Sequence, residues 1–345
     1  MANELYQGIG TELQGKGFLV EEKEADKKRQ LQTLEDTGLY VAEPKLDGIW
    51  FSADIGEGGT AEDVVIRSRE GKTKDVEPLR KVLAKCFPSR TTLIGELGYG
   101  SQTAVEKKER IGHDFCDLFD ITCYAGESLL NDRRADRRET LRNAHFAAMH
   151  EAANRGLDEL WFSLTEQWVD NFVQHYEDEA EGIVLKRKDN GAYVGGGKLK
   201  EWIKVKKQYT DDFVVMGWVK SVSETKKDRN MVAAIICGAY VNCTQYQAWK
   251  KYEGWLKTLE IQTLEPPRTL QSDYRLILVP LVKCGAIPHE LSLDMAEHFE
   301  EKYLGRTVEI SHFMKFKSGS VRHPGFVRFR DDKLSRECIE ENVEL

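Results

Sequence analysis

The sequence has no run of about 18 consecutive apolar residues. Its N-terminus, MANELYQGIGTELQGKG, lacks the basic start and apolar core of a secretory signal. Its 7 cysteines, an odd number, form no Cys-x-x-Cys pair. A membrane span, a signal peptide, a disulfide scaffold and a zinc ribbon are therefore not expected. A reducing, cytoplasmic compartment is the simplest interpretation.

The sequence also lacks an overall positive charge, since its net charge is -8. That sum alone argues against a nucleic-acid partner. From residue 181 to residue 207, however, there are 8 lysines and arginines against 3 aspartates and glutamates. Salt screens charges beyond about 10 Å, so a phosphate chain responds to such a local window. The window is either a nucleic-acid contact or a solvated basic face.

The length of 345 residues predicts two domains. The first 37 residues or so have a charged, helical character that Gly38 would end, and residues 132–156 have helical periodicity. Short apolar runs between turn residues predict the strands of a mixed sheet: LYVAEPK, GIWFSADI, DVVIRSR, TTLIGEL, CDLFDITCY, GIVLKRK and KEWIKVKK. Later runs predict a small β-barrel: DFVVMGWVKSV, MVAAIICGAYV, RLILVPLVKCG and RTVEISHFMKF, with a helical piece at LDMAEHFEEKY. We expect the domain boundary at 207–210.

Residues 43–50 read EPKLDGIW, so that Lys45 and Asp47 flank one leucine and Gly48 follows. A lysine amine becomes a useful nucleophile when desolvation or neighbouring cations lower its pKa. A nearby carboxylate orients a substrate or metal, and a glycine lets the backbone approach a ligand closely. Because Lys-x-Asp-Gly is also common at ordinary turns, a simple strand and turn remains the alternative.

Two later strands carry groups that suit a phosphate. Glu181 stands at the mouth of the apolar run GIVLK, and Lys204 and Lys206 alternate along WIKVK. Alternation places both lysines on one face of a strand. Two ammonium groups on one face repel each other unless an anion such as phosphate lies between them. A solvent-facing strand is the alternative.

Together these segments resemble the covalent nucleotidyltransferase superfamily of ATP-dependent DNA ligases, RNA ligases and mRNA-capping enzymes, over about residues 40 to 335. Further segments match in order: SREG at 68–71, GEL at 95–97 with Ile94 in place of the family's Asp, LFDI at 118–121, the basic helix at Arg137-Arg138, and RDDK at 330–333. The stretch SGSVRHPGFVRFR is similar to the close of small bacteriophage DNA ligases. The Glu181 motif and WIKVK have the ligase form, which favours a compact, phage-type DNA ligase.

The resemblance implies a three-step chemistry. Lys45 would attack the α-phosphate of ATP, the lysyl-AMP would pass to the 5′-phosphate of a DNA nick, and the 3′-hydroxyl would displace AMP. Asp47 would act near that hydroxyl, while Lys204 and Lys206 would hold the α-phosphate. Catalysis of this kind is mainly alignment and neutralisation of charge.

The resemblance also implies the ligand contacts. Glu43 would hydrogen-bond the adenine and Phe119 would stack on it. Glu96 and Glu181 would contact the nucleotide and hold Mg²⁺. Arg330, Asp332 and Lys333, on a mobile domain, would meet the pyrophosphate. The implied DNA contacts are Arg69, which also belongs to the nucleotide site, Lys186, Lys188 and Lys198.

The fold implied by the resemblance is α+β. It comprises a nucleotidyltransferase (adenylation) domain at 1–207, with mixed or antiparallel sheets and helices, and an OB-fold β-barrel at 208–345. ATP and Mg²⁺ are the implied cofactors, and nicked duplex DNA is the implied partner in repair or replication. A monomer without membrane attachment is expected, in the host cytoplasm if a phage encodes it.

Two alternatives remain, an RNA ligase with the same adenylation chemistry and a nick-binding relative without turnover. The second is suggested by Trp50, because most relatives carry an arginine two residues after the glycine. An indole has one N–H donor and no charge. We expect another cation, Arg67 or Lys186, to take over that role, or the backbone path to shift there.

Overall fold

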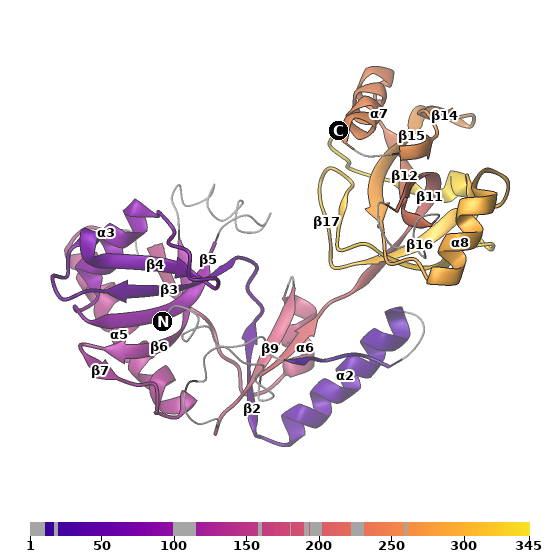
Figure 1. Ribbon diagram of the computed structural model, residues 1–345. Coiled ribbons are helices and arrows are strands. Elements are labelled where there is room, and N and C mark those ends of the chain that lie inside the picture. The colour runs from indigo at the N-terminus through magenta and orange to yellow at the C-terminus, as the bar shows by residue number, and fades with distance from the viewer. Residues whose placement is uncertain are drawn as a thin grey trace. The chain divides into compact units, whose positions relative to one another are not determined.

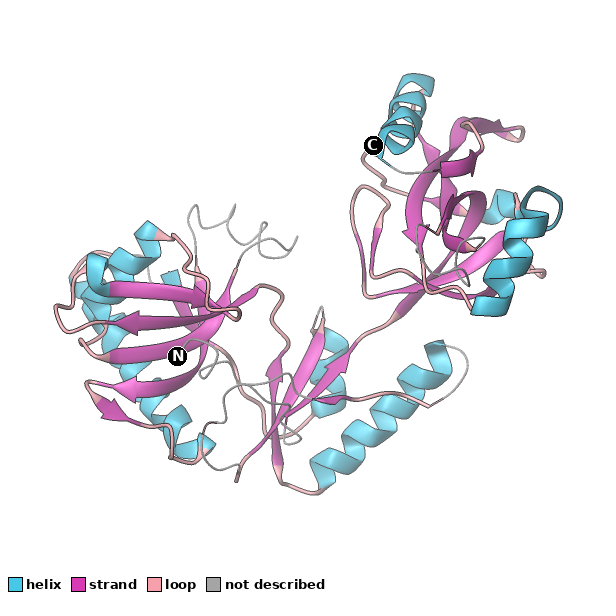
Figure 2. Ribbon diagram, viewed as in Figure 1, coloured by secondary structure: helices cyan, strands magenta, loops and turns pink. Residues whose placement is uncertain are grey.

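The structure is a computed structural model, and it describes residues 11–16, 20–98, 115–157, 161–179, 181–189, 193, 202–221, 231–258 and 261–345. The chain divides into two compact units, Met1–Lys16 with Lys23–Lys207, and Gly17–Glu22 with Gln208–Leu345. Both units are built mainly of strands with a few helices (Figures 1 and 2). No helix in the described part of the chain is long and apolar enough to cross a membrane.

The smaller sheet of the first unit has the strand order β1-β10-β9-β2. Its strands are β1 (Thr11–Glu12), β10 (Trp202–Lys206), β9 (Gly182–Arg187) and β2 (Tyr40–Pro44). One face packs on helices α2 (Val20–Asp36) and α6 (Phe172–Asp178). Alternation along the strands turns Ile183, Leu185 and Val205 into this core, where Leu31 and Phe172 meet them. The other face therefore remains for polar side chains.

The larger sheet of the first unit has the order β4-β3-β5-β6-β7, and β8 pairs with β6. The bounds are β3 (Ile49–Ile55), β4 (Val64–Ser68), β5 (Thr91–Leu97), β6 (Cys116–Tyr124), β7 (Glu127–Ser128) and β8 (Phe162–Leu164). Three helical elements accompany it, η1 (Ala61–Asp63), α3 (Glu77–Cys86) and α5 (Arg134–Asn154). Phe51, Leu93 and Leu118 on the sheet pack with Leu83 and Leu141 on the helices. This core fixes the strands that carry the GEL and LFDI segments.

The second unit is a curled sheet with the order β14-β15-β12-β11-β16-β19, to which β13 and β20 are attached. The bounds are β11 (Tyr209–Lys220), β12 (Val232–Asn242), β13 (Ile261–Leu264), β14 (Arg268–Leu270), β15 (Asp273–Cys284), β16 (Thr307–His312), β19 (Gly325–Phe329) and β20 (Ile339–Glu340). Its other elements are α7 (Gln245–Thr258), α8 (His289–His298), the π-helix η3 (Phe299–Tyr303), the hairpin β17 (Met314–Lys315) with β18 (Val321–Arg322), and η4 (Ser335–Glu337). Gly285, after β15, forms a bridge with Gly325 in β19, so the sheet closes into a small barrel.

The predicted strand runs coincide with observed strands, but two expectations are corrected. Residues 11–12, expected to be helical, form β1 and pair in parallel with β10. The run RTVEISHFMKF is not one strand, because the chain leaves the barrel sheet at Phe313 and continues in the separate β17–β18 hairpin. Gly38 has a φ of 66°, the left-handed conformation that ends helices, two residues after α2.

All seven cysteines are free, and five of them are buried. Burial raises the pKa of Cys86 and of Cys338 to about 11, and that of Cys284 to about 12. These thiols are therefore core side chains rather than nucleophiles or metal ligands. Cys123 and Cys243 are the two that are partly exposed.

Candidate active site

A cavity of about 340 Å³ lies between the polar faces of the two sheets of the first unit. We call it the inter-sheet cavity. Seven of the predicted site residues line it: Glu43, Lys45, Arg69, Glu96, Phe119, Lys186 and Lys204. They come from β2, β5, β6, β9, β10 and the turns that follow β2 and β4. The fold thus gathers residues that are up to 161 positions apart in the sequence.

Lys45 follows β2 directly, and its backbone N–H donates a hydrogen bond of 2.9 Å to the carbonyl of Gly182 at the start of β9. This bond holds Lys45 beside Glu181, and its Nζ forms an ion pair with the Glu181 carboxylate. Both side chains are largely buried, with 18% and 12% exposed. The lysine amine therefore has a carboxylate at hydrogen-bonding distance and limited contact with water.

Gly48 is required by packing against β5. A Cβ at this position would lie 2.1 Å from the carbonyl oxygen of Leu97, so no other residue fits. The N–H of Gly48 donates a 3.1 Å hydrogen bond to Oε1 of Glu96. Gly48 also lines the inter-sheet cavity, so the expected close approach of its backbone to a ligand stays a prediction.

Glu96 is an acid of the cavity whose pKa is raised. Burial raises its pKa to about 7, against the opposing effects of the Lys45 charge and the Gly48 N–H. The negative charges of Glu181 and Asp47 raise it further. Asp47, Glu96 and Glu181 therefore share one electrostatic environment around Lys45.

Glu43 and Lys186 form a buried ion pair on the floor of the cavity. Lys186 Nζ lies 2.5 Å from Glu43 Oε2, and their side chains are 4% and 2% exposed. Arg134, from the first turn of α5, donates to the other carboxylate oxygen, as does Gln167 at 3.1 Å. Burial would raise the pKa of Glu43, but the charges of Lys186 and Arg134 outweigh it and lower the pKa. Glu43 is thus ionised and held by three donors.

Lys186 lies over two aromatic rings rather than at the surface. Its Nζ is 4.6 Å from the ring centre of Phe119 and 4.1 Å from that of Trp202. Burial lowers its pKa to about 8 although Glu43 opposes the shift. This position does not favour the DNA contact expected for Lys186, because a buried cation cannot reach a phosphate chain. It supports a role inside the cavity.

Lys204 and Lys206 have different surroundings, although they share one face of β10. Lys204 lines the inter-sheet cavity, and burial together with the charges of Lys45 and Lys206 lowers its pKa. Lys206 is 3.1 Å from Glu12 of β1 and does not line this cavity. Strand β1, which the sequence did not predict, therefore supplies Glu12 as a counter-ion for Lys206, one of the two predicted phosphate ligands.

The predicted DNA contacts are dispersed. Arg69 lines the rim of the inter-sheet cavity, about half exposed, 3.7 Å from Glu70. Lys188 donates a 2.9 Å hydrogen bond to the carbonyl of Gly38 and lies away from this cavity. Lys198 lies outside the described residues.

Trp50 lines the cavity directly opposite Glu96 in the β3–β5 pair. The two cations expected to replace its missing arginine both form ion pairs. Arg67 forms an ion pair with Asp54, and Lys186 pairs with Glu43. Lys186 lines the same cavity as Trp50, and which cation takes over the role of the missing arginine stays a prediction.

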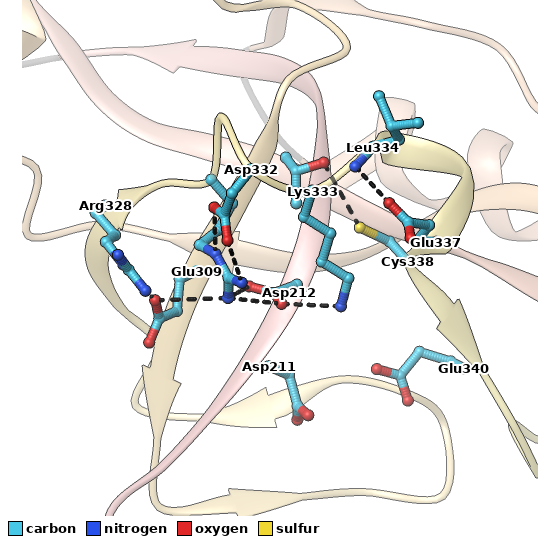
Figure 3. Close-up of polar contacts among 12 residues, drawn as sticks. Asp211, Asp212, Glu309, Arg328, Asp332, Lys333, Leu334, Glu337, Cys338 and Glu340 are labelled. Carbon is cyan, nitrogen blue, oxygen red and sulfur yellow. Dashed lines mark hydrogen bonds and ion pairs between the residues drawn. The ribbon is translucent and has the colours of Figure 1, made fainter. Parts of the chain in front are cut away.

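The RDDK segment forms a compact charged cluster in the second unit (Figure 3). Arg330 Nη1 lies 3.1 Å from Asp212, and Lys333 Nζ donates to the same carboxylate at 2.9 Å. Arg330 also makes two 2.9 Å hydrogen bonds to Asp332, which lower the pKa of that carboxyl to about 2. Glu309 completes the cluster. Asp212, on β11, thus holds both basic residues together.

Sequence reasoning missed Arg134, Trp202 and Asp212. Arg134 lies one helical turn before the recognised Arg137-Arg138 pair, so the basic run DRRADRR contained the signal. Trp202 opens the recognised run WIKVK, where alternation places it on the face of Lys204. Asp212 follows another aspartate in a strand and carried no signal of its own.

No protein-family model matches the chain. The chain is 25% identical over 318 residues to the multifunctional non-homologous end joining protein LigD of Pseudomonas aeruginosa. This match includes 88% of the chain, which spans about a third (35%) of the length of that relative.

Two solved structures share the fold. One comes from a structure–function study of DNA binding by Lig E DNA ligases, with a TM-score of 0.53 and 16% identity over 94% of this chain and 100% of that chain. The other is named Pmar-Lig_Pre, with a TM-score of 0.56 and 16% identity over 95% of this chain and 68% of that chain. The chain therefore has a DNA ligase fold, in which an α+β nucleotidyltransferase unit is followed by an OB-fold barrel.

Proposed function

We propose that this protein is an ATP-dependent DNA ligase that seals 5′-phosphate/3′-hydroxyl nicks through a lysyl-AMP intermediate. The observation that carries the proposal is the ion pair with Glu181 that is formed by Lys45, which lines the inter-sheet cavity together with Glu96 and Lys204. The likeness to LigD and the ligase fold support it. In this proposal residues 1–207 form the adenylation domain and 208–345 the OB-fold domain, and the protein acts as a monomer in the cytoplasm, in repair or replication.

The residues around Lys45 suit displacement at phosphorus. The Lys45 ammonium must lose a proton before it attacks, and the Glu181 carboxylate is placed to accept it. The amine then forms a bond to the α-phosphorus while the bond to pyrophosphate breaks. Lys204, whose pKa is lowered by burial and by neighbouring lysines, supplies positive charge to the same phosphate.

The later steps use the same groups. A 5′-phosphate oxygen displaces the lysine from phosphorus, which frees Lys45 and gives an adenylylated DNA end. The 3′-hydroxyl, with Asp47 nearby, then displaces AMP and forms the phosphodiester. Arg69 at the rim would hold the nick phosphate, while Lys188 and Lys198 would contact the duplex. Arg330 and Lys333, held by Asp212, would serve the pyrophosphate in the first step.

The adenine would lie against Phe119, since stacking of a base on an aromatic side chain contributes about 1–3 kcal/mol. Glu43, ionised by Lys186 and Arg134, would accept the hydrogen bonds of the base. Trp202 meets Phe119 edge to face, with ring centres 6.5 Å apart, and so fixes the orientation of the stacking ring.

Glu96 and Glu181 fit Mg²⁺, which prefers oxygen ligands and is held by one or two carboxylates together with substrate phosphates. Among the described residues no group of three or more His, Cys, Asp or Glu side chains could hold a metal alone, so phosphates would complete the shell. The ion would neutralise charge on the phosphates. Because Glu96 has a pKa of about 7, it becomes an anionic ligand in the neutral range.

The decisive experiment follows AMP transfer and sealing in parallel. Intact mass after incubation with ATP and Mg²⁺ should increase by one AMP, and Lys45→Arg, which keeps the charge, should abolish the adduct. Absence of an adduct would favour the nick-binding alternative, and an adduct that persists in Lys45→Arg would contradict the assigned nucleophile.

Sealing is then measured on a singly nicked DNA duplex and on a nicked RNA duplex, with ATP or NAD. We expect sealing of the DNA with ATP. A preference for the RNA duplex would replace the proposal with an RNA ligase, and a requirement for NAD would exclude an ATP-dependent enzyme.

A further inference from the structure

Helix α7 stands out from the barrel of the second unit. It is inserted in the connection between β12 and β15, which are neighbouring antiparallel strands. Ala248 packs into the barrel core, whereas Tyr246 is 75% exposed and Trp249 45% exposed. One face of the helix therefore packs against the barrel, and exposed aromatic side chains lie on the rest of the helix surface.

A cavity of about 600 Å³ lies between α7 and the end of β15. We call it the lysine–aromatic cavity. The α7 residues that line it include Tyr246, Lys250 and Gly254, which are spaced four positions apart and so share one face of the helix. Six of the eight residues that line the cavity are Tyr246, Lys250, Lys251, Gly254, Trp255 and Lys283, and the other two are Gln247 and Leu345.

The lysines of this cavity have no acidic partner in the chain, as far as the described residues show. Lys250, Lys251 and Lys283 take part in no ion pair there, although the protein as a whole carries a net charge of -8. Burial lowers the pKa of Lys251, and no carboxylate charge in the described part opposes that shift. The cavity is thus a local excess of positive charge, which an anionic ligand would complement.

Gly254 keeps the cavity open. Glycine is unfavourable in the interior of a helix, where alanine is preferred. A Cβ at Gly254 would meet no atom within 4 Å, so packing does not require the glycine. Because Gly254 has no side chain, the space that a Cβ would occupy stays open in the cavity, which gives a flat group room to approach.

We propose that the lysine–aromatic cavity binds a segment of single-stranded DNA. One unpaired base would stack on Tyr246 or Trp255, and the three lysines would contact the flanking phosphates. An unpaired strand fits better than a duplex because paired bases hide the faces that aromatic side chains stack on. The choice of DNA as the nucleic acid rests on the proposed function.

The test is binding of the full-length protein to a fluorescent single-stranded oligonucleotide, by anisotropy, over a series of salt concentrations. Replacing Lys250, Lys251 and Lys283 by Gln should lower the slope of log K against log salt by about 2, since each phosphate contact contributes about 0.7 for single strands. Tyr246→Ala should weaken binding by about tenfold at every salt concentration, because stacking depends little on salt.

Matched controls separate the cavity from the rest of the unit. Tyr274, 78% exposed, and Lys317, also exposed, lie outside the cavity, so Tyr274→Ala and Lys317→Gln should bind like the unmodified protein. Gly254→Leu should fill the cavity and weaken binding without loss of folded structure, as checked by circular dichroism. Equal losses in the controls, or no loss in Tyr246→Ala and the triple lysine variant, would overturn the proposal.

Two competitors test the class of ligand. A duplex of the same sequence should displace the labelled strand poorly, and so should an acidic peptide of equal charge. Equal competition by either would overturn single-stranded DNA as the ligand. The AMP adduct at Lys45 is measured on the same variants and should be unchanged. If the AMP adduct forms but strand binding does not depend on the cavity, the binding site is excluded and the proposed function stands. If strand binding depends on the cavity but no AMP adduct forms, the proposed function is excluded and the binding site stands.

Discussion

Among single residues, Glu96 is the one whose ionisation should be visible in the stability of the protein. Burial raises its pKa from 4.5 to about 7, so between these values the folded chain binds more protons than the unfolded chain. Its contribution to the free energy of unfolding should therefore fall as the pH rises from 5 to 8. The expected loss is on the order of 1–3 kcal/mol.

Urea denaturation in EDTA at the two pH values measures this loss. Glu96→Gln should remove this pH-dependent loss. The free energy of unfolding of the variant, relative to that of the unmodified protein, should therefore increase as the pH rises. Parallel pH dependences in the two proteins would show that Glu96 titrates normally.

Trp50→Arg should change Glu96 directly. Because Trp50 lies opposite Glu96 in the β3–β5 register, the new guanidinium would lie beside the carboxylate. An opposite charge within about 4–6 Å lowers an acid's pKa by about 1–3 units. The pH-dependent loss of stability should then shrink, and nick sealing at high salt should become faster. Trp50→Gln, which adds no charge, is the control, and equal behaviour of the two variants would mean that charge is not what the position lacks.

The partners of individual residues were the least predictable part of the site. Glu43 and Arg134 are 91 positions apart, and nothing in the spacing of the sequence indicates that they meet. The contact of Gly48 with Leu97 becomes visible only once the strand register is known. Lys45 and Glu181 could be paired beforehand only because the resemblance placed both in one site.

At the scale of elements, α5 is fastened to β6 by a fully buried ion pair. Arg137 Nε and Nη2 donate to the two oxygens of Asp120 at 2.9 and 3.0 Å, and the two side chains are 0% and 3% exposed. Arg137→Ala should lower the free energy of unfolding by about 3–5 kcal/mol, because it leaves a buried carboxylate without its partner. Urea denaturation measures the loss.

The double variant Asp120→Asn/Arg137→Met tests the reason for that loss. It removes both charges and keeps most of the volume, so it should be more stable than Arg137→Ala alone. A double variant as unstable as the single one would mean that packing, rather than the unpaired charge, accounts for the effect.

Elements were more predictable than partners because alternation and helical period depend on neighbouring residues. Every apolar run quoted from the first unit became a strand, since each buries one face against a helix-covered core. The failures have a different origin. β1 exists only through its pairing with β10, and the break at Phe313 depends on which sheet each half joins. Both are tertiary effects that local propensity does not contain.

For the whole molecule, the separate cores of the two units predict two unfolding transitions. One core joins Phe51 with Leu141, and another joins Phe213 with Val279. At 100 times its Kd, α,β-methylene ATP should raise the free energy of unfolding of the first unit by about 2.7 kcal/mol. In calorimetry the unfolding transition of the first unit should therefore move to a higher temperature, and that of the second unit should not move. A single transition, or an equal shift of both, would contradict independent units.

The buried cysteines make the molecule easy to equip with probes. Thiols whose pKa is about 11 or 12 are almost entirely protonated near neutrality, and maleimide dyes react with the thiolate. Only Cys123 and Cys243 would need replacement by serine before a single cysteine is introduced on each unit. A donor and an acceptor dye at those positions would then report, one molecule at a time, whether the distance between the units changes when ATP is added.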